Sequence, residues 1–153
     1  PRPYASSDNA ILMDFIGDEH ESAPTLHSVT LSGTEARQLF ERVLFNIELM
    51  LRCNRVHADL SAYNILYWQG GIKLIDFPQA INPDENLNAY RIFARDVERI
   101  CGYFTTQGVK ADPIKLSARM WRSRGRLTEP ELDPLFLDPE KPEDRQAWNR
   151  STR

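Results

Sequence analysis

The sequence of 153 residues has few cysteines, no long apolar run and little excess of charge. Its two cysteines, Cys53 and Cys101, lie far apart in apolar helical stretches, where a free thiol behaves as a small buried side chain. This usage favours a reducing, cytoplasmic setting. Charged residues interrupt the apolar runs, so we expect neither a membrane-spanning helix nor a signal peptide. The net charge of −3 implies no attraction of the whole chain to nucleic acid or acidic membranes.

The apolar residues that are present indicate one ordinary domain with a helical core. They make up 41% of the chain, which is far from a disordered composition. Two apolar stripes recur at helical spacing, and two short apolar runs flank a pair of glycines. We therefore expect an α+β fold, mostly α, with a small β-hairpin. The expected elements are a strand over 10–16, a helix over 34–53, strands over 65–68 and 72–75, a helix over 86–105 and a helix over 112–125.

Several helix boundaries carry recognisable signals. Ser32 and Glu35 fit an S-x-x-E capping box at the start of the first long helix. Asp112 followed by Pro113 predicts another helix start, because Asp caps free N–H groups and proline suits the first helical position. A second capping box at 128–131 predicts a short last helix, after which the chain becomes polar.

The N-terminal strand has no evident partner, because almost no chain precedes it. A strand must pair its backbone groups with a neighbour, and the first residue is Pro1 rather than Met. We therefore expect the chain to be part of a longer protein. The expected division is 1–17 as the end of an N-terminal lobe with its hinge strand, 18–137 as a C-terminal lobe and 138–153 as a polar tail.

The segment from His57 to Asn64, followed by Asp76, carries the residue types that phosphoryl transfer requires. Such a transfer needs a carboxylate to orient or deprotonate the attacking oxygen, and oxygen ligands that hold Mg²⁺ against the phosphates. Protein kinases supply them as H-R-D-L-x-x-x-N followed by D-F-G. Asp59 and Asn64 keep that separation, and the expected hairpin folds Asp76 back towards Asn64. We expect these three side chains to converge on one divalent ion.

Individual residues in and around this segment have simpler interpretations. A single Asp or Asn in a loop is usually a turn former, so only the combined pattern favours function. His57 is expected to pack and hydrogen-bond rather than titrate. Asp96 is expected to accept backbone hydrogen bonds from the catalytic loop. The basic residues Arg119, Arg122, Arg124 and Arg126 could touch a phosphate-rich partner, but a solvated helix face is the simpler interpretation.

The strings H-A-D-L-S-A-Y-N-I-L and I-D-F-P-Q resemble the RIO kinases, whose catalytic loops read H-x-D-L-S-x-Y-N. Similarity extends from residue 10 to residue 120 and includes a hinge-like segment from Met13 to Gly17. The resemblance implies the C-terminal lobe of a RIO-type atypical serine/threonine protein kinase, with the hairpin carrying the catalytic and metal-binding loops. It also implies binding of ATP with Mg²⁺ or Mn²⁺, and serine autophosphorylation or ATPase-type turnover.

The same resemblance implies a role for each site residue. Asp59 would be the catalytic aspartate, and Asn64 and Asp76 the metal ligands. In the family the metal-binding aspartate can itself accept phosphate, as carboxylate nucleophiles do. Asp14 through its C=O and Ile16 through its N–H would contact adenine. Besides ATP, the implied partner is a protein substrate or the chain itself, and in some lineages similar proteins are linked to ribosome maturation.

Three parts of a conventional protein kinase are missing from the pattern. No A-P-E motif follows Asp76, which argues against a conventional protein kinase, but RIO kinases share this lack. Neither a glycine-rich loop nor a strand-borne Lys paired with a helix Glu is found. Because positioning and charge stabilisation supply most of the catalysis in phosphoryl transfer, we expect the chain on its own to be nearly inactive.

Two other functions remain open. A small-molecule phosphotransferase of the aminoglycoside-kinase kind also uses an H-x-D…N…I-D-x pattern, although Ser61, Tyr63 and the sequence over 77–79 argue against it. A kinase lobe that has lost its chemistry and serves as a scaffold is the second alternative. The joint presence of both aspartates and the asparagine argues against such decay.

Overall fold

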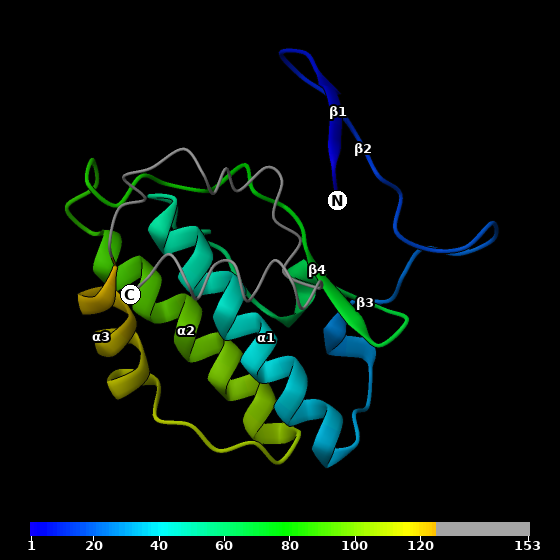
Figure 1. The fold of residues 1–153 in the computed structure, drawn as a ribbon. Helices are drawn as coiled ribbons and strands as arrows, with labels where there is room; N and C mark the ends of the chain where they lie inside the picture. Colours follow the sequence, from blue (N-terminus) through cyan, green and yellow to red (C-terminus); the bar gives the residue numbers. More distant parts are fainter. Residues whose placement is uncertain (125–153) are drawn as a thin grey trace, which may run out of the picture.

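The computed structural model describes residues 1–124, and its architecture is α+β and mostly helical, as the sequence predicts. Figure 1 shows the long helices in one body, with one hairpin packed at its side and another projecting away from it. The elements are β1 (Pro3–Ser6), β2 (Ile11–Met13), η1 (Leu26–Ser28), α1 (Gly33–Arg52), η2 (Ala62–Asn64), β3 (Ile65–Trp68), β4 (Gly71–Leu74), α2 (Ala89–Thr106) and α3 (Pro113–Ser123).

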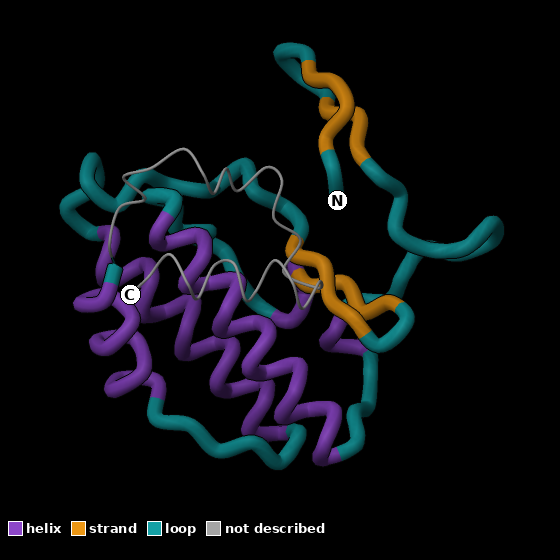
Figure 2. The backbone as a smooth tube through the Cα atoms, in the orientation of Figure 1, coloured by secondary structure: helices purple, strands orange, loops and turns teal. Residues whose placement is uncertain are grey.

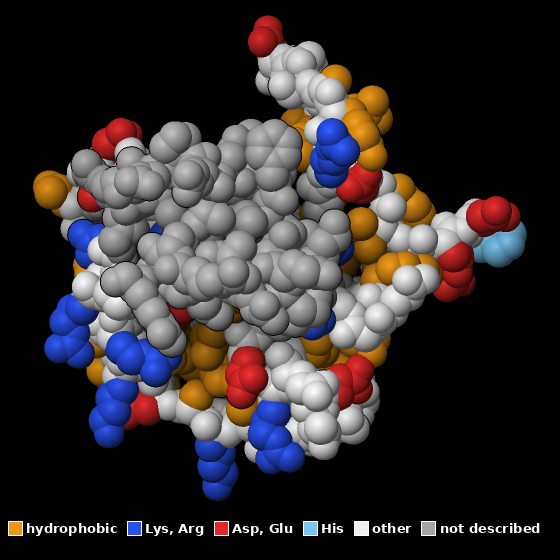
Figure 3. All heavy atoms as spheres, viewed as in Figure 1, with side chains coloured by type: hydrophobic (Ala, Val, Ile, Leu, Met, Phe, Trp, Pro, Cys, Tyr) orange, Lys and Arg blue, Asp and Glu red, His pale blue; other side chains and the backbone are white. Residues whose placement is uncertain are grey.

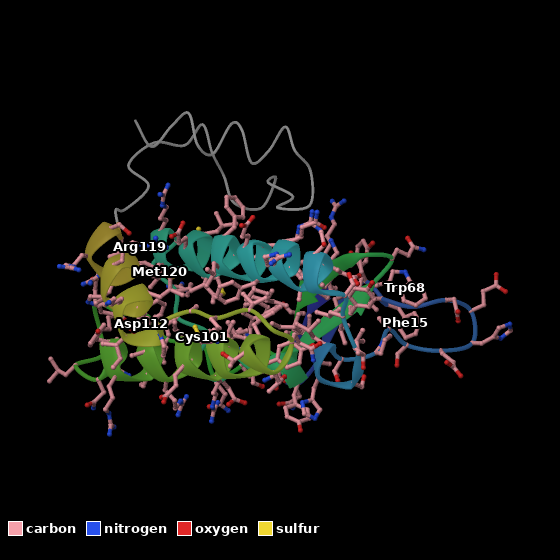
Figure 4. The ribbon with its side chains drawn as sticks, turned by 90° about the horizontal axis from the view of Figure 1, so that it is seen from below. Phe15, Trp68, Cys101, Asp112, Arg119 and Met120 are labelled. Atoms are coloured by element: carbon pink, nitrogen blue, oxygen red, sulfur yellow. The ribbon has the colours of Figure 1, made fainter. Side chains whose placement is uncertain are left out.

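The core lies between α1 and α2, which form two layers with side chains between them (Figure 4). The rings of Phe40 and Phe104 meet there at a centroid distance of 5.1 Å. Helix α3 closes the core against α2, where Met120 is buried and Trp121 lies 5.5 Å from the ring of Phe93. No helix within residues 1–124 combines the length and apolar character needed to cross a membrane.

The helix starts follow the sequence signals. The hydroxyl of Ser32 accepts a hydrogen bond from the backbone N–H of Glu35, so α1 begins one residue before the expected position. The carboxylate of Glu35 accepts a hydrogen bond from the hydroxyl of Tyr67, which ties the start of α1 to β3. Asp112 accepts hydrogen bonds from the N–H groups of the second and third residues of α3, which therefore begins at Pro113 as predicted.

The β3–β4 hairpin also has the predicted form, with its second strand one residue earlier. The strands are antiparallel, with Ile65 opposite Leu74, and Gln69 and Gly70 make the turn. Both turn residues have positive φ angles, 50° and 76°, which is the backbone geometry that suits the twist of a tight hairpin. The hairpin places the segment after β4 beside the segment before β3.

The N-terminal strand differs from the prediction over 10–16 in two ways: it is shorter, spanning Ile11–Met13, and it does have a partner. Strand β2 pairs with β1 in an antiparallel hairpin whose register is irregular between Pro3 and Ala5. The pattern before residue 7 has no apolar alternation and includes prolines, so it gave no strand signal. The tube in Figure 2 shows this hairpin joined to the helical body by the long loop that follows β2.

Helix α2 begins at Ala89, three residues later than predicted. The side chain of Asn86 accepts a hydrogen bond from the N–H of Asn88, and this local turn competes with helix at that point. The predicted helix stop at Gly125, the short last helix and the tail over 138–153 lie outside the described residues.

Candidate active site

A buried histidine anchors the loop that leads from α1 to β3. The side chain of His57 is 1% exposed, and its Nε2 donates to the carbonyl oxygen of Ile75 at 2.9 Å. Its ring also packs on the ring of Phe77 at a centroid distance of 4.8 Å. His57 therefore joins the start of the loop to the end of β4, in the packing role that the sequence predicts.

The side chain of Asn64 bridges back across the same loop. Its Nδ2 donates to the backbone carbonyl of Asp59 at 2.9 Å and lies 3.4 Å from Oδ2 of that residue. The backbone carbonyl of Asn64 accepts a hydrogen bond from the N–H of Ile75 at 3.0 Å. Because Asp76 follows Ile75 directly, this hydrogen bond brings the second aspartate next to the first loop.

Two residues of the site have left-handed backbone conformations that side chains rarely adopt. Ala58 has φ of 68° and Asp76 has φ of 67°. Such conformations cost energy and persist where the surroundings hold them in place. Ala58 directly precedes Asp59, Asp76 is itself a candidate residue, and the side chain of Asp76 is exposed to solvent.

Helix α2 holds three successive residues of the loop. The guanidinium of Arg95 donates to the carbonyl of Ala58, and the N–H of Leu60 hydrogen-bonds the carboxylate of Asp96. Between them, Nη1 of Arg99 donates to Oδ1 of Asp59 at 2.8 Å. One face of α2 therefore fixes the backbone on both sides of Asp59 as well as its carboxylate.

Asp96 is the most deeply buried charged side chain of this arrangement, with 3% of its surface exposed. Burial raises its pKa above the usual range, and the hydrogen bond from Leu60 and the charge of Arg95 oppose this only in part. Among the described residues, Oδ2 of Asp96 has no hydrogen-bond partner. Asp96 thus supports the loop as predicted, while its burial keeps it away from solvent.

The candidate residues offer the oxygen atoms that Mg²⁺ requires. No group of three His, Cys, Asp or Glu side chains forms a metal site within residues 1–124, but Mg²⁺ needs only one or two carboxylates besides phosphate oxygens and water. The amide nitrogen of Asn64 is occupied by the loop, so its oxygen is left for another partner. Asp76 is exposed. The residues present therefore fit a Mg²⁺ site.

Asp14 and Ile16, the residues expected at the hinge, lie in the segment after β2, apart from these loops. The carboxylate of Asp14 accepts hydrogen bonds from the hydroxyl of Tyr4 and the N–H of Arg2, and these lower its pKa. The carbonyl of Ile16 accepts a hydrogen bond from the N–H of Ala23 at 2.8 Å. The adenine contacts expected of Asp14 and Ile16 stay predictions.

Sequence reasoning missed Arg95 and Arg99. They lie four residues apart on α2 and flank Asp96. Because Asp96 was already expected to contact the loop, its neighbours on the same helix face could have been expected to reach the loop as well.

Arginines on a helix more often face solvent, and Arg119 and Arg122 of α3 are exposed, as the simpler interpretation predicts. Arg124 follows α3, is half-buried, lies over the ring of Trp121 and donates to its carbonyl oxygen, whereas Arg126 lies outside the described residues. On the face shown in Figure 3, Lys and Arg side chains are spread around the margin with acidic residues among them.

Comparison with known proteins identifies the family. A family model for the RIO domain matches residues 1–116. Human serine/threonine-protein kinase RIO1 is 34% identical over 116 residues, which are 75% of this chain and 20% of that protein. The RIO-type kinase Rio1 of Thermoplasma acidophilum is 29% identical over 116 residues, which are 76% of this chain and 59% of that protein. The chain thus spans less than two thirds of either relative.

A solved structure confirms the fold. The crystal structure of the Rio2 kinase-ADP/Mg²⁺-phosphoaspartate complex from Chaetomium thermophilum superposes with a TM-score of 0.67 and 22% sequence identity. The match covers 99% of this chain and 48% of the Rio2 chain. The kinase-like architecture predicted from the catalytic-loop pattern is therefore confirmed. Taken with the match to the family model, it shows that the chain belongs to the RIO-domain family.

Proposed function

We propose that this chain supplies the phosphate-transfer groups of an ATP-dependent RIO-type serine/threonine kinase or ATPase. The observation that carries the proposal is the hydrogen bond from the N–H of Ile75 to the carbonyl of Asn64. It brings the loop of Asp59 and Asn64 together with the segment of Asp76. Relatives named as serine/threonine kinases support the same reaction class.

Each residue has a stated task in this proposal. Asp59 orients the acceptor hydroxyl and takes its proton while the acceptor oxygen bonds to the γ-phosphorus and the bond from that phosphorus to ADP breaks. Asn64 and Asp76 would hold Mg²⁺, or Mn²⁺, which when bound offsets the negative charge of the β- and γ-phosphates. Asp14 through its C=O and Ile16 through its N–H would contact adenine.

ATPase-type turnover would use the exposed carboxylate of Asp76 as the acceptor. Its oxygen would bond to the γ-phosphorus as ADP leaves, and water would then hydrolyse the phosphoaspartate to regenerate the carboxylate and release phosphate. The related Rio2 kinase was solved as a complex with ADP, Mg²⁺ and phosphoaspartate, which supports this route for the family. In the kinase reaction, a serine of a protein substrate or of the chain itself takes the phosphoryl group.

The 153 residues carry no glycine-rich loop and no strand-borne Lys paired with a helix Glu to clamp the ATP phosphates. We therefore propose that this segment alone turns ATP over far more slowly than a protein that carries those parts. A cytoplasmic location and a ribosome-related partner stay predictions from the sequence.

Phosphate release from ATP by the natural full-length protein tests the proposal. We expect Asp76→Asn to abolish Mg²⁺-dependent release and Asp59→Asn to lower it by about 10²–10⁴-fold, the range for loss of a general base. Ser61→Ala serves as the matched control in the same loop and should be mild, since its hydroxyl is not assigned to the chemistry. Full activity of Asp59→Asn or of Asp76→Asn would overturn the proposal. Turnover that rises strongly only with small alcohol acceptors would favour the aminoglycoside-kinase alternative, and inactivity of the parent would favour the scaffold.

A further inference from the structure

Arg99 forms an ion pair with the carboxylate of Asp59, the proposed catalytic residue. Its Nη1 lies 2.8 Å from Oδ1 of Asp59, although the two residues are separated by 40 positions in the sequence. The side chains are 41% and 47% exposed. A guanidinium has five N–H donors, so the contact with Asp59 leaves other N–H groups of Arg99 available for further hydrogen bonds.

The charges around the site make this contact significant. Between His57 and Phe77 the sole Lys or Arg is Lys73, and it alternates along β4 with the buried side chains of Ile72 and Leu74. The loop from Asp59 to Asn64 itself carries no cation. Two aspartates would therefore face the phosphates without any positive side chain from their own loops.

We propose that Arg99 is a positioning residue for phosphoryl transfer, an inference that rests on the proposed function. By holding Oδ1 of Asp59, it turns Oδ2 towards the acceptor hydroxyl, whose proton Oδ2 receives as the acceptor oxygen bonds to the γ-phosphorus and ADP departs. Its positive charge also offsets the repulsion between the carboxylate of Asp59 and the phosphoryl group.

A purely structural role does not account for the contact. Ion pairs between exposed side chains contribute little to folding stability, because water and salt screen them. The backbone on either side of Asp59 is already held by Arg95 and Asp96. Loss of Arg99 therefore leaves the loop attached to α2 and removes the contact at Oδ1 of Asp59, while the amide of Asn64 remains 3.4 Å from Oδ2.

The test compares Arg99→Met with Arg91→Met in the natural full-length protein. Arg91 is an exposed arginine on the same helix and has no part in the proposed machinery. We expect Arg99→Met to lower kcat by about 100-fold, the size of effect seen when one charge-stabilising donor is removed from an active site. The Tm and the affinity for Mg²⁺-ADP should stay at the parental values, because ADP lacks the transferred group. Arg99→Lys should recover part of kcat, and Arg91→Met should match the parent.

The double variant Arg99→Met with Asp59→Asn shows whether Arg99 acts through Asp59. We expect it to be no slower than Asp59→Asn alone, since residues that act as a unit are not additive. Independent, multiplying losses would overturn the inference, as would an unchanged kcat in Arg99→Met or an equal loss in Arg91→Met. If Asp59→Asn is itself fully active, the proposed function fails instead, so the two failures are distinguishable.

Discussion

The imidazole of His57 donates a hydrogen bond from Nε2 to the carbonyl oxygen of Ile75 at 2.9 Å. This bond joins a residue two positions before Asp59 to the residue directly before Asp76. The two halves of the candidate site are thus connected through a buried side chain that touches neither acceptor nor nucleotide in the proposed reaction. The geometry of the candidate site therefore depends on His57, a residue that has no role in the proposed reaction.

Replacing His57 by alanine should destabilise the fold. The variant loses a buried hydrogen bond and leaves a cavity beside Phe77, so we expect the free energy of unfolding to fall by about 2–4 kcal/mol. Urea denaturation measures the change. His20→Ala, at an exposed histidine in the loop after β2, is the matched control and should stay within about 0.5 kcal/mol of the parent. Equal effects of the two substitutions would contradict the anchoring role of His57.

Nucleotide binding should separate the two aspartates of the site. Asp76→Asn removes a proposed metal ligand. We expect the Mg²⁺-dependent affinity for ADP to fall by about 10-fold or more, because replacing even a residue that only hydrogen-bonds to a metal ligand lowers metal affinity by that much. Asp59→Asn should leave the affinity near the parental value, because Asp59 acts on the acceptor. Calorimetric titration of the natural full-length protein with ADP, with and without Mg²⁺, gives both numbers. Reversed behaviour of the two variants would show that their roles are exchanged.

The buried carboxylate of Asp96 should give a definite pH dependence to stability. Its pKa is raised above the ordinary value of 3.8, so the folded state binds the proton more tightly than the unfolded state. The stability that Asp96 contributes is fully present below pH 3.8 and is lost as the pH rises through the raised folded-state pKa. The unfolding free energy of the parent minus that of Asp96→Asn should therefore fall over this window in urea titrations at successive pH values.

Asp18→Asn provides the control of opposite sign. Backbone N–H groups of His20 and Glu21 hydrogen-bond Asp18 and lower its pKa, so its contribution is lost as the pH falls. The corresponding difference for this variant should rise with pH. A flat difference for Asp96→Asn would mean that burial does not govern the protonation of Asp96.

Two glycine substitutions should have opposite effects on stability. Gly17 has φ of 155°, and an added Cβ would collide with the carbonyl oxygen of Glu21, so Gly17→Ala should cost about 1–3 kcal/mol. Gly102 lies inside α2 with open space around it, and Gly102→Ala should add about 0.5–1 kcal/mol, since alanine favours helix. Thermal unfolding of both variants checks the signs. Stabilisation by Gly17→Ala would show that the loop after β2 relaxes freely.

Local signals account for the parts of the fold that the sequence predicts. The capping residues Ser32 and Asp112 specify helix starts through their own side chains, and the turn at Gly70 needs a backbone that glycine adopts readily. The partner of β2 was not foreseen, because pairing of a strand with Pro3–Ser6 depends on the surrounding chain and leaves no apolar pattern.

For the candidate site, residue type and spacing predict which groups carry the chemistry but not how they are held. The motif selects Asp59, Asn64 and Asp76, and the roles expected of His57 and Asp96 agree with their hydrogen bonds. The contact of Arg99 joins positions 40 residues apart, so only the folded chain reveals it.

The hydrogen bonds between α2 and the candidate catalytic loop restrict where insertions and deletions can occur during evolution. Arg95, Asp96 and Arg99 fall within one stretch of five positions, and a single residue inserted just before them within the helix would rotate that face by about 100°. Homologous chains should therefore accommodate insertions in the turn region over 78–88, where added loop length costs little. The spacing of Arg95, Asp96 and Arg99 should be the same in all orthologues. Gaps in an alignment of orthologues should therefore fall in that turn region and not within the first half of α2.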